Sequence, residues 1–213
     1  MEKSAKLGKL TLLNIILFGF IGQVAWAVEN NFFNTFLFSF GGTTKDISTM
    51  VAASAVVAVV TTFVMGTLSD KLGRRKVFIC AGYVAWGITV MAFAFISREN
   101  LGKLIGADPS SAAALSATVT TVIVMDCIMT FMGSTSNDSA FNAWITDVTV
   151  PSNRAKTEGL LAILPVLALV IVTGVFGFIA GDDAQASDYA TCFLGLGILV
   201  IICGIVGIFT IKD

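Results

Sequence analysis

The stretch that decides the fold is Gly66-Thr67-Leu68-Ser69-Asp70-Lys71-Leu72-Gly73-Arg74-Arg75-Lys76. It places four basic residues and one acidic residue between two apolar runs. Each run has about twenty residues, which is the length that a helix needs to cross a bilayer. The core of a soluble protein has no use for this arrangement, whereas a membrane protein keeps its positive charges in cytoplasmic loops. Residues 66–76 are therefore predicted to form a tight cytoplasmic turn between two transmembrane helices.

The composition is also typical of a membrane protein. Hydrophobic residues make up 56% of the 213 residues and charged residues only 13%, and the mean hydropathy is +0.89. The absence of histidine excludes histidine-based catalytic triads and most zinc sites. The four cysteines lie in apolar segments without C-x-x-C spacing and are expected to be buried hydrophobic residues. We expect no enzyme activity, metal or cofactor, because no nucleophile–base pair or ligand cluster can be assembled, and no nucleic-acid partner.

Six apolar segments are long enough to span a membrane, so the predicted fold is all-α and multi-pass, with one domain over residues 1–213. The predicted helices comprise residues 10–38, 48–69, 77–97, 115–145, 158–180 and 189–211. In the fourth, the apolar part ends near Met132, and a small, polar run from Gly133 to Asp138 follows. Such groups suit a helix that lines a water-filled cavity. We therefore predict that this helix continues to about Ile145.

The basic residues are distributed unevenly between the two sides of the predicted helices. If the N-terminus is cytoplasmic, ten of them are cytoplasmic, namely Lys3, Lys6, Lys9, Lys71, Arg74, Arg75, Lys76, Arg154, Lys156 and Lys212. Only Lys45, Arg98 and Lys103 lie on the other side. The positive-inside rule then places both termini in the cytoplasm. The outer loops offer no glycosylation context, which is consistent with the inner (plasma) membrane of a bacterium.

Polar side chains of the first predicted helix gather on one face. At about 100° per residue, four of them fall within a sector of about 80°. They are Gln23, Trp26, Asn30 and Asn34. Amides bond hydroxyl groups and an aromatic ring packs on C–H faces, so this face suits a sugar. Asn137 and Asn142 of the fourth helix are further candidates for the same site, and the alternative role for such amides is helix–helix hydrogen bonding.

Three acidic residues inside predicted helices are candidates for proton coupling, namely Glu29, Asp126 and Asp138. A carboxyl group in a low-dielectric cavity favours its neutral form and can then bind and release a proton near neutral pH. The alternative is a structural carboxylate paired with a buried base. No Lys or Arg lies inside any predicted span, so such a base would have to come from elsewhere.

Charged and small residues at the cytoplasmic helix ends form a predicted gate. It comprises Gly66, Asp70, Gly73, Arg74, Arg75, Asp147 and Arg154. Opposite charges at helix ends can pair, and such pairs must break before the inner side opens. The alternative, positive-inside anchoring alone, does not explain the position of Asp70.

The two halves of the chain share a weak internal similarity. Phe33-Asn34 in the first helix corresponds to Phe141-Asn142 in the fourth, about half a chain length apart. A three-plus-three inverted repeat would produce this pattern, and chance similarity is the alternative.

The motif G-x-L-x-D-K-x-G-R-R-K at residues 66–76 resembles the loop between the second and third helices of major facilitator superfamily transporters. Residues 26–36 and 137–154 resemble the sugar:cation branch, which includes glycoside–pentoside–hexuronide symporters and sucrose:proton symporters. The resemblance implies the N-terminal six-helix half of a twelve-helix transporter, with a sugar held between two halves. In that branch an acidic residue of the fourth helix helps to bind the sugar, and Asn137 or Asp138 is the matching position.

Sodium-coupled members of the branch keep acidic residues in the second helix, and residues 48–69 contain none. The resemblance therefore favours protons over sodium as the coupling ion. We expect a sugar:proton symporter half that works by alternating access, with a sugar, the lipid bilayer and a second six-helix half as partners. That half would be in the same chain, a separate chain or a second copy. The alternatives are a non-transporting truncated or assembly subunit and a transporter of another small solute.

Overall fold

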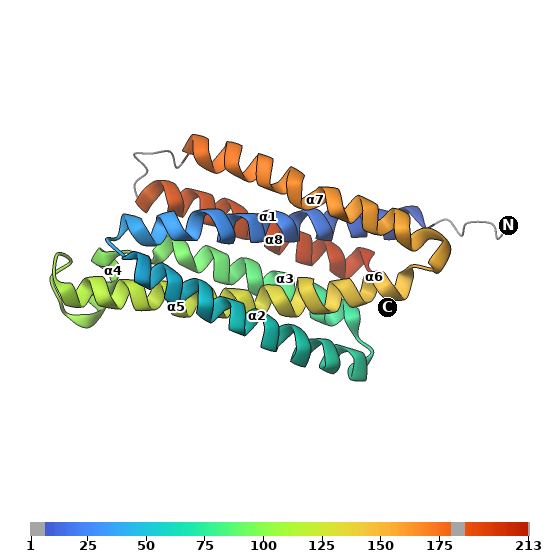
Figure 1. Ribbon diagram of the computed structural model, residues 1–213, viewed down its shortest axis with the longest axis horizontal. Coiled ribbons are helices and arrows are strands. Elements are labelled where there is room, and N and C mark those ends of the chain that lie inside the picture. The colour runs from blue at the N-terminus through green and yellow to red at the C-terminus, as the bar shows by residue number, and fades with distance from the viewer. Residues whose placement is uncertain (1–6, 180–185, 213) are drawn as a thin grey trace.

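The computed structural model describes residues 7–179 and 186–212, which form an elongated bundle of antiparallel helices (Figure 1). Every regular element in these residues is helical. The elements are α1 Lys9–Ser39, α2 Thr44–Leu72, α3 Arg75–Ala92, η1 Phe93–Phe95, α4 Arg98–Ile105, α5 Ala112–Gly133, η2 Ser134–Phe141, α6 Asn142–Val148, α7 Pro151–Ile179 and α8 Ala186–Thr210. η1 is a short 3-10 turn and η2 is a π-helix.

Six helical spans in the described residues are long and apolar enough to cross a membrane. They are Lys9–Ser39, Thr44–Leu72, Arg75–Phe95, Ala112–Val148, Pro151–Ile179 and Ser187–Thr210. This confirms the predicted all-α fold with six spans. The predicted end of the fifth helix, Ala180, lies outside the described residues. The short helix α4 lies at the end of the bundle opposite the 66–76 turn (Figure 1).

The second span, Thr44–Leu72, is longer at both ends than the predicted helix of residues 48–69, because capping interactions extend it. At its start, the Thr43 side chain accepts a hydrogen bond from the Asp46 N–H, and the Asp46 carboxylate accepts one from the Thr43 N–H at 2.8 Å. At its end, Gly73 has a φ of 60°. Glycine enters this left-handed conformation without steric cost, so the chain can turn sharply into α3.

The fourth span consists of α5, η2 and α6 in one continuous helix, which confirms that it extends beyond Met132. Its polar run bonds largely to itself. The hydroxyl groups of Thr135, Ser136 and Ser139 donate to backbone carbonyls four residues earlier, at 2.7, 2.8 and 2.7 Å. Each hydroxyl is thus satisfied inside the helix, and the run can lie at membrane depth.

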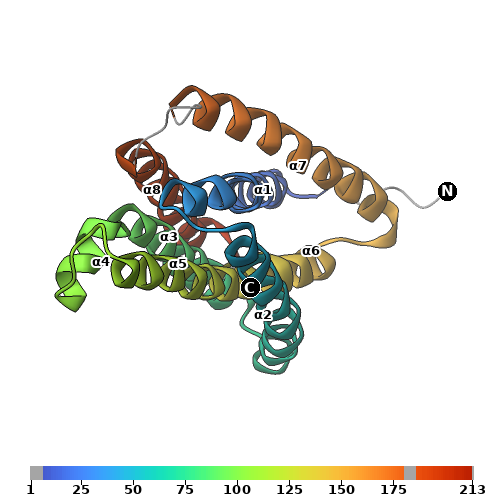
Figure 2. The same ribbon diagram turned by 60° about the vertical axis from the view of Figure 1, so that its left-hand side comes forward.

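The core lies where α3 passes between α8 and the fourth span. A Cβ added to Gly87 of α3 would lie 2.6 Å from the carbonyl oxygen of Gly197 in α8, so small residues let these two backbones approach closely. Toward the end that carries α4, the rings of Phe33, Phe93 and Phe193 pack with centroids 4.4 to 5.8 Å apart. Helices α2 and α7 lie on opposite flanks of this core (Figure 2).

Basic residues gather at one end of the bundle, where α1, α3 and α7 begin and α2, α6 and α8 end (Figure 1). The described ones there are Lys9, Lys71, Arg74, Arg75, Lys76, Arg154, Lys156 and Lys212. Lys45, Arg98 and Lys103 lie at the opposite end, and Lys3 and Lys6 lie outside the described residues. We call the first of these the basic end.

Candidate functional site

A polar cavity of about 410 Å³ opens between α1, α2 and the fourth span. Its lining comprises Gln23, Trp26, Glu29, Asn30, Val51, Ser54, Ala55, Ala58, Thr130 and Asp138. Helix α1 supplies the amides, the indole and one carboxyl group, whereas α2 supplies small and apolar side chains. The volume is within the range of small-molecule sites.

Glu29 is held in the cavity by a neutral donor. The Thr130 hydroxyl of α5 donates to Glu29 Oε1 at 3.1 Å. The other carboxylate oxygen, Oε2, is buried and has no hydrogen-bond partner among the described residues. An unsatisfied carboxylate oxygen away from bulk water is costly when charged. The arrangement therefore leaves Glu29 one open position for a proton or a substrate hydroxyl.

Asp138 is held in a similar way from its own helix. The Ser134 hydroxyl donates to Asp138 Oδ2 at 2.9 Å, and the indole of Trp26 lies beside this carboxyl group. Asp126 lies behind the cavity wall, only 2% exposed, next to Ser54 of α2. Its Oδ1 has no hydrogen-bond partner in the described part of the chain. The three carboxyl groups thus form one cluster, with two facing the cavity and one behind it.

The cluster has no basic counterpart among the residues that line the cavity. The eleven Lys and Arg side chains of the described residues belong to helix ends or to loops. In the described residues no group of three or more acidic, cysteine or histidine side chains is placed to hold a metal ion. Neutral hydroxyls and protons are the means by which these carboxyl groups can be stabilised.

Trp26 owes its position to a glycine. A Cβ on Gly133 would come within 2.9 Å of Trp26 and 2.8 Å of Trp86. The two indole rings pack against each other with centroids 5.0 Å apart. The fourth span can therefore approach the pair only because residue 133 lacks a side chain, which holds the Trp26 ring in the cavity wall.

Of the six residues predicted to bind substrate, Gln23, Trp26 and Asn30 line the cavity, and Asn34, Asn137 and Asn142 do not. Asn142 is exposed and bonds the Asp138 carbonyl at 3.0 Å. Asn137 is buried, and its Nδ2 donates to the Tyr83 hydroxyl at 2.7 Å. Tyr83 in turn donates to the Phe18 carbonyl at 2.6 Å. This bridge joins the fourth span, α3 and α1, so Asn137 has the helix–helix role that was the alternative for the amides.

Thr130 and Ser134, which bind the two cavity carboxyl groups, are not among the residues predicted for the site. The sequence does contain a pattern that links them to the acidic residues, because Thr130 shares a helix face with Asp126 and Ser134 precedes Asp138 by one turn. Hydroxyl residues are common in membrane helices, so spacing alone does not distinguish these two from their neighbours.

At the basic end, Arg75 connects three helix ends. It forms an ion pair with Asp70 at the end of α2. Its Nε donates to Asp147 Oδ2 of α6 at 3.1 Å, and its Nη1 donates to the buried Ser69 hydroxyl at 2.6 Å. The ion-pair network of Asp70, Arg75 and Asp147 therefore ties the 66–76 turn to the fourth span.

The other predicted gate residues lie around this network. Arg154 donates to the Thr146 carbonyl at 2.8 Å and to the Thr149 hydroxyl at 3.2 Å. It thus binds the end of α6, where unpaired carbonyls attract a cation, rather than Asp147. Arg74 is exposed outside the network. A Cβ on Gly66 would lie 3.7 Å from Ser139, which marks the crossing of α2 and η2.

Comparison with known protein families gives one match. The Major Facilitator Superfamily profile matches residues 14–213, which is nearly the whole chain. The chain belongs to the Major Facilitator Superfamily. Neither a curated protein nor a solved structure matches it.

Membership in the Major Facilitator Superfamily identifies the chain as a membrane transporter, with a substrate and a lipid bilayer as its partners. Members of this superfamily are transporters rather than enzymes. The polar cavity is the candidate for the substrate site of this transporter, and the network around Arg75 is the candidate gate. The resemblance found in the sequence is thus confirmed for the superfamily, and the sugar:cation branch stays a prediction.

Proposed function

We propose that the chain is the six-helix half of a proton-coupled sugar symporter that works by alternating access. The observation that carries this proposal is the pair of cavity carboxyl groups, Glu29 and Asp138, whose partners among the described residues are neutral donors. A carboxylate paired with Arg or Lys keeps its charge, but a carboxyl group among neutral donors can gain and lose a proton. Such a group can couple proton movement to transport.

The rest of the cavity supports a neutral, hydroxyl-rich substrate. Gln23 and Asn30 bring amides to the lining, and Trp26 brings an aromatic face. Amides both donate to and accept from hydroxyl groups, and an indole covers the apolar face of a sugar ring. The Asn30 amide donates one N–H to the Trp26 carbonyl at 2.8 Å, so its oxygen and its second N–H can bond a substrate hydroxyl.

Alternating access requires a second six-helix half. The flank of α2 next to the cavity favours such a partner, because Val59 and Phe63 are 72% and 77% exposed. We propose that the basic end faces the cytoplasm of a bacterium, with both termini there. The ion-pair network of Asp70, Arg75 and Asp147 then lies on the inner side and opens when the cavity faces inward.

A proton-flux experiment tests this function. De-energised cells that express the full-length protein receive sugars from a panel, and the pH of a weakly buffered medium is recorded. We expect one or more sugars to make the medium alkaline as protons enter with them, with cells carrying the empty vector as control. Entry of a labelled sugar without alkalinisation would overturn proton coupling. No entry of any sugar would overturn the substrate class.

A second candidate is transport of an organic cation. The specific observation in its favour is the acidic lining without a basic residue, next to the Trp26 ring. Ammonium groups bind both carboxylates and indole faces. If amines, but no sugars, enter the cells and exchange for protons in the opposite direction, this candidate replaces the first.

A further inference from the structure

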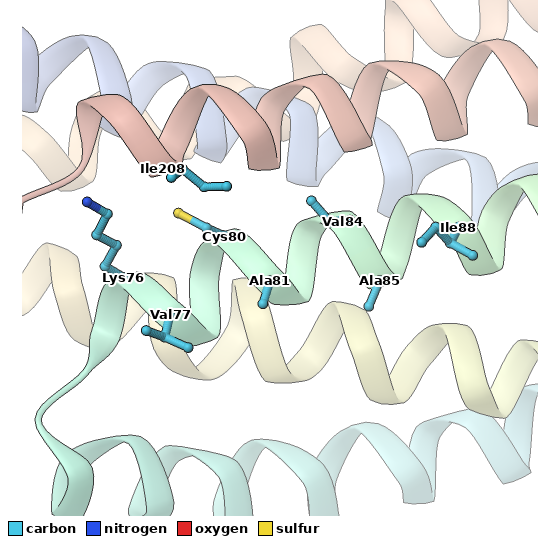
Figure 3. Close-up of a pocket in the computed structure, with 8 residues that line it drawn as sticks. All are labelled: Lys76, Val77, Cys80, Ala81, Val84, Ala85, Ile88 and Ile208. Atoms are coloured by element: carbon cyan, nitrogen blue, oxygen red, sulfur yellow. The ribbon is translucent and has the colours of Figure 1, made fainter.

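A second hollow lies on the outside of the bundle, away from the polar cavity. It is a groove of about 490 Å³ between α3 and the end of α8, and its wall is almost wholly apolar. Figure 3 shows Cys80 and Val84 on the side of α3 toward α8, and Ala81 and Ala85 on the opposite side. Lys76 stands at one end of the groove, near Ile208 of α8.

The length of the groove matches one leaflet of a bilayer. Its lining on α3 runs from Lys76 to Ile88, which is about 18 Å of helix at about 1.5 Å per residue. The hydrocarbon of one leaflet is about 15 Å deep, half of a core of about 30 Å. The small side chains Ala81 and Ala85 keep the groove open along this length. An acyl chain therefore fits the groove from the basic end to about the middle of the membrane.

The mouth of the groove is positively charged. Lys76 lines it, and Arg74 is exposed at the start of the same helix. Lys212 follows Ile208 by four residues, just beyond the end of α8. A lysine at the end of a membrane helix extends its ammonium group toward the headgroups. The charge at the mouth thus complements a phosphate at the membrane surface.

Another apolar hollow of the molecule differs from this groove in charge. This hollow, of about 400 Å³, lies between α7 and α8 and is lined by residues such as Val24, Val172 and Leu199. None of the described residues that line it is charged. An acyl chain can lie in this hollow, but its described lining has no charged side chain that could bind a particular lipid headgroup.

We propose that the α3–α8 groove is a binding site for an anionic phospholipid. One acyl chain lies along α3 between Val77 and Ile88, and the phosphate lies at Lys76. Arg75, the centre of the ion-pair network with Asp70 and Asp147, is the residue next to Lys76. The lipid thus binds beside the candidate gate, and its site does not depend on the identity of the substrate.

Native mass spectrometry of the full-length protein, released from bilayers of equal phosphatidylglycerol and phosphatidylcholine, tests the proposal. We expect the wild type to retain phosphatidylglycerol in preference to phosphatidylcholine. Lys76→Gln should lower this preference about fivefold, the effect of one lysine near an anionic surface. Lys156→Gln, a change of an exposed lysine at the same end of the bundle, should leave the preference unchanged. An unchanged preference in Lys76→Gln would overturn the headgroup assignment.

A second variant tests the groove itself. Ala81 is exposed, so Ala81→Phe fills the groove without entering the core, and it should lower retention of both lipids. Ala162→Phe, at an exposed position of α7 that lines neither hollow, is the matched control. Retention equal to wild type in Ala81→Phe would overturn the site, because the retained lipid would then be bound outside the groove. The groove would in that case be covered by another segment of protein or by a second copy.

Discussion

Two groups of carboxyl side chains in this molecule differ in what holds them. At the basic end, Asp70 and Asp147 share the guanidinium of Arg75. In the polar cavity, Glu29 and Asp138 accept from neutral donors, namely the hydroxyl groups of Thr130 and Ser134. Both groups join α-helices that are far apart in the sequence, but only the first contains a positive charge.

The difference determines what each group can do. A carboxylate beside Arg is stabilised in its charged form, since the guanidinium does not lose its proton in proteins. Such a pair can form or break, which suits a gate. A carboxyl group among hydroxyl groups, away from water, has no fixed countercharge. Adding a proton therefore removes the free-energy cost of burying its negative charge. Such a group suits coupling.

The largest effect is expected from removing the protonatable group itself. One proton moving through about 100 mV supplies about 2.3 kcal/mol, which corresponds to about fiftyfold accumulation. Glu29→Gln keeps the size and a hydrogen-bond partner for Thr130 but cannot change charge. We expect proton-driven accumulation of the substrate to fall to about the external concentration, while exchange of labelled for unlabelled substrate continues.

The measurement for Glu29→Gln is uptake with and without a proton gradient, at equal amounts of protein in the membrane. Glu158→Gln, a change at an exposed position of α7 outside the cavity, is the control. Normal accumulation in Glu29→Gln would show that Glu29 does not couple proton movement to transport.

The next effect concerns the neutral bonds that position the fourth span. Tyr83→Phe removes the hydroxyl that accepts from Asn137 and donates to the Phe18 carbonyl. The Asn137 amide then loses its acceptor in the core and the Phe18 carbonyl loses its second partner, at a cost of about 1–2 kcal/mol. We expect a lower midpoint of thermal unfolding in detergent. Tyr189→Phe, which removes a hydroxyl group outside this bridge, is the control. A midpoint in Tyr83→Phe equal to that of Tyr189→Phe would show that the bridge does not stabilise the bundle.

A smaller effect is expected from breaking the charged group. Arg75→Gln removes both ion pairs, and because Asp70 and Asp147 are more than half exposed, we expect a loss of only about 1 kcal/mol. Hydrogen exchange of residues 66–76 should become about fivefold faster. Arg74→Gln, outside the network, should leave the exchange rate unchanged. Equal rates in the two variants would contradict the assignment of Arg75 as the centre of the gate.

The smallest effect is expected from an ion pair that joins only neighbours on one helix. Lys103 pairs with Glu99 at 2.7 Å on the surface of α4, and its ammonium lowers the pKa of the Glu99 carboxyl. Lys103→Gln should return this pKa toward its ordinary value without changing transport or the thermal midpoint. A measurable loss of transport would show that charge pairs outside the basic end also contribute to gating.

Sequence patterns predicted most of the framework. Runs of about twenty apolar residues suffice to identify spanning helices, since backbone groups in lipid must bond within a helix. The polar run after Met132 predicted the long fourth helix, and helical spacing predicted that Gln23, Trp26, Asn30 and Asn34 share a face. The first three line one cavity, because side chains one turn apart point to the same neighbour, whereas Asn34 does not line it.

The amino-acid sequence by itself determined the six spans, the polar faces of the first and fourth, and the end at which positive charge collects. These depend on local periodicity and on hydrophobicity, which each segment carries alone. Only the tertiary structure decided which partner each polar group takes. Arg75 binds Asp147, which is 72 residues away, and Asn137 bonds Tyr83 rather than lining the cavity. Such pairings depend on how helices cross and rotate, and the close approach at Gly133 and at Gly87 sets that geometry.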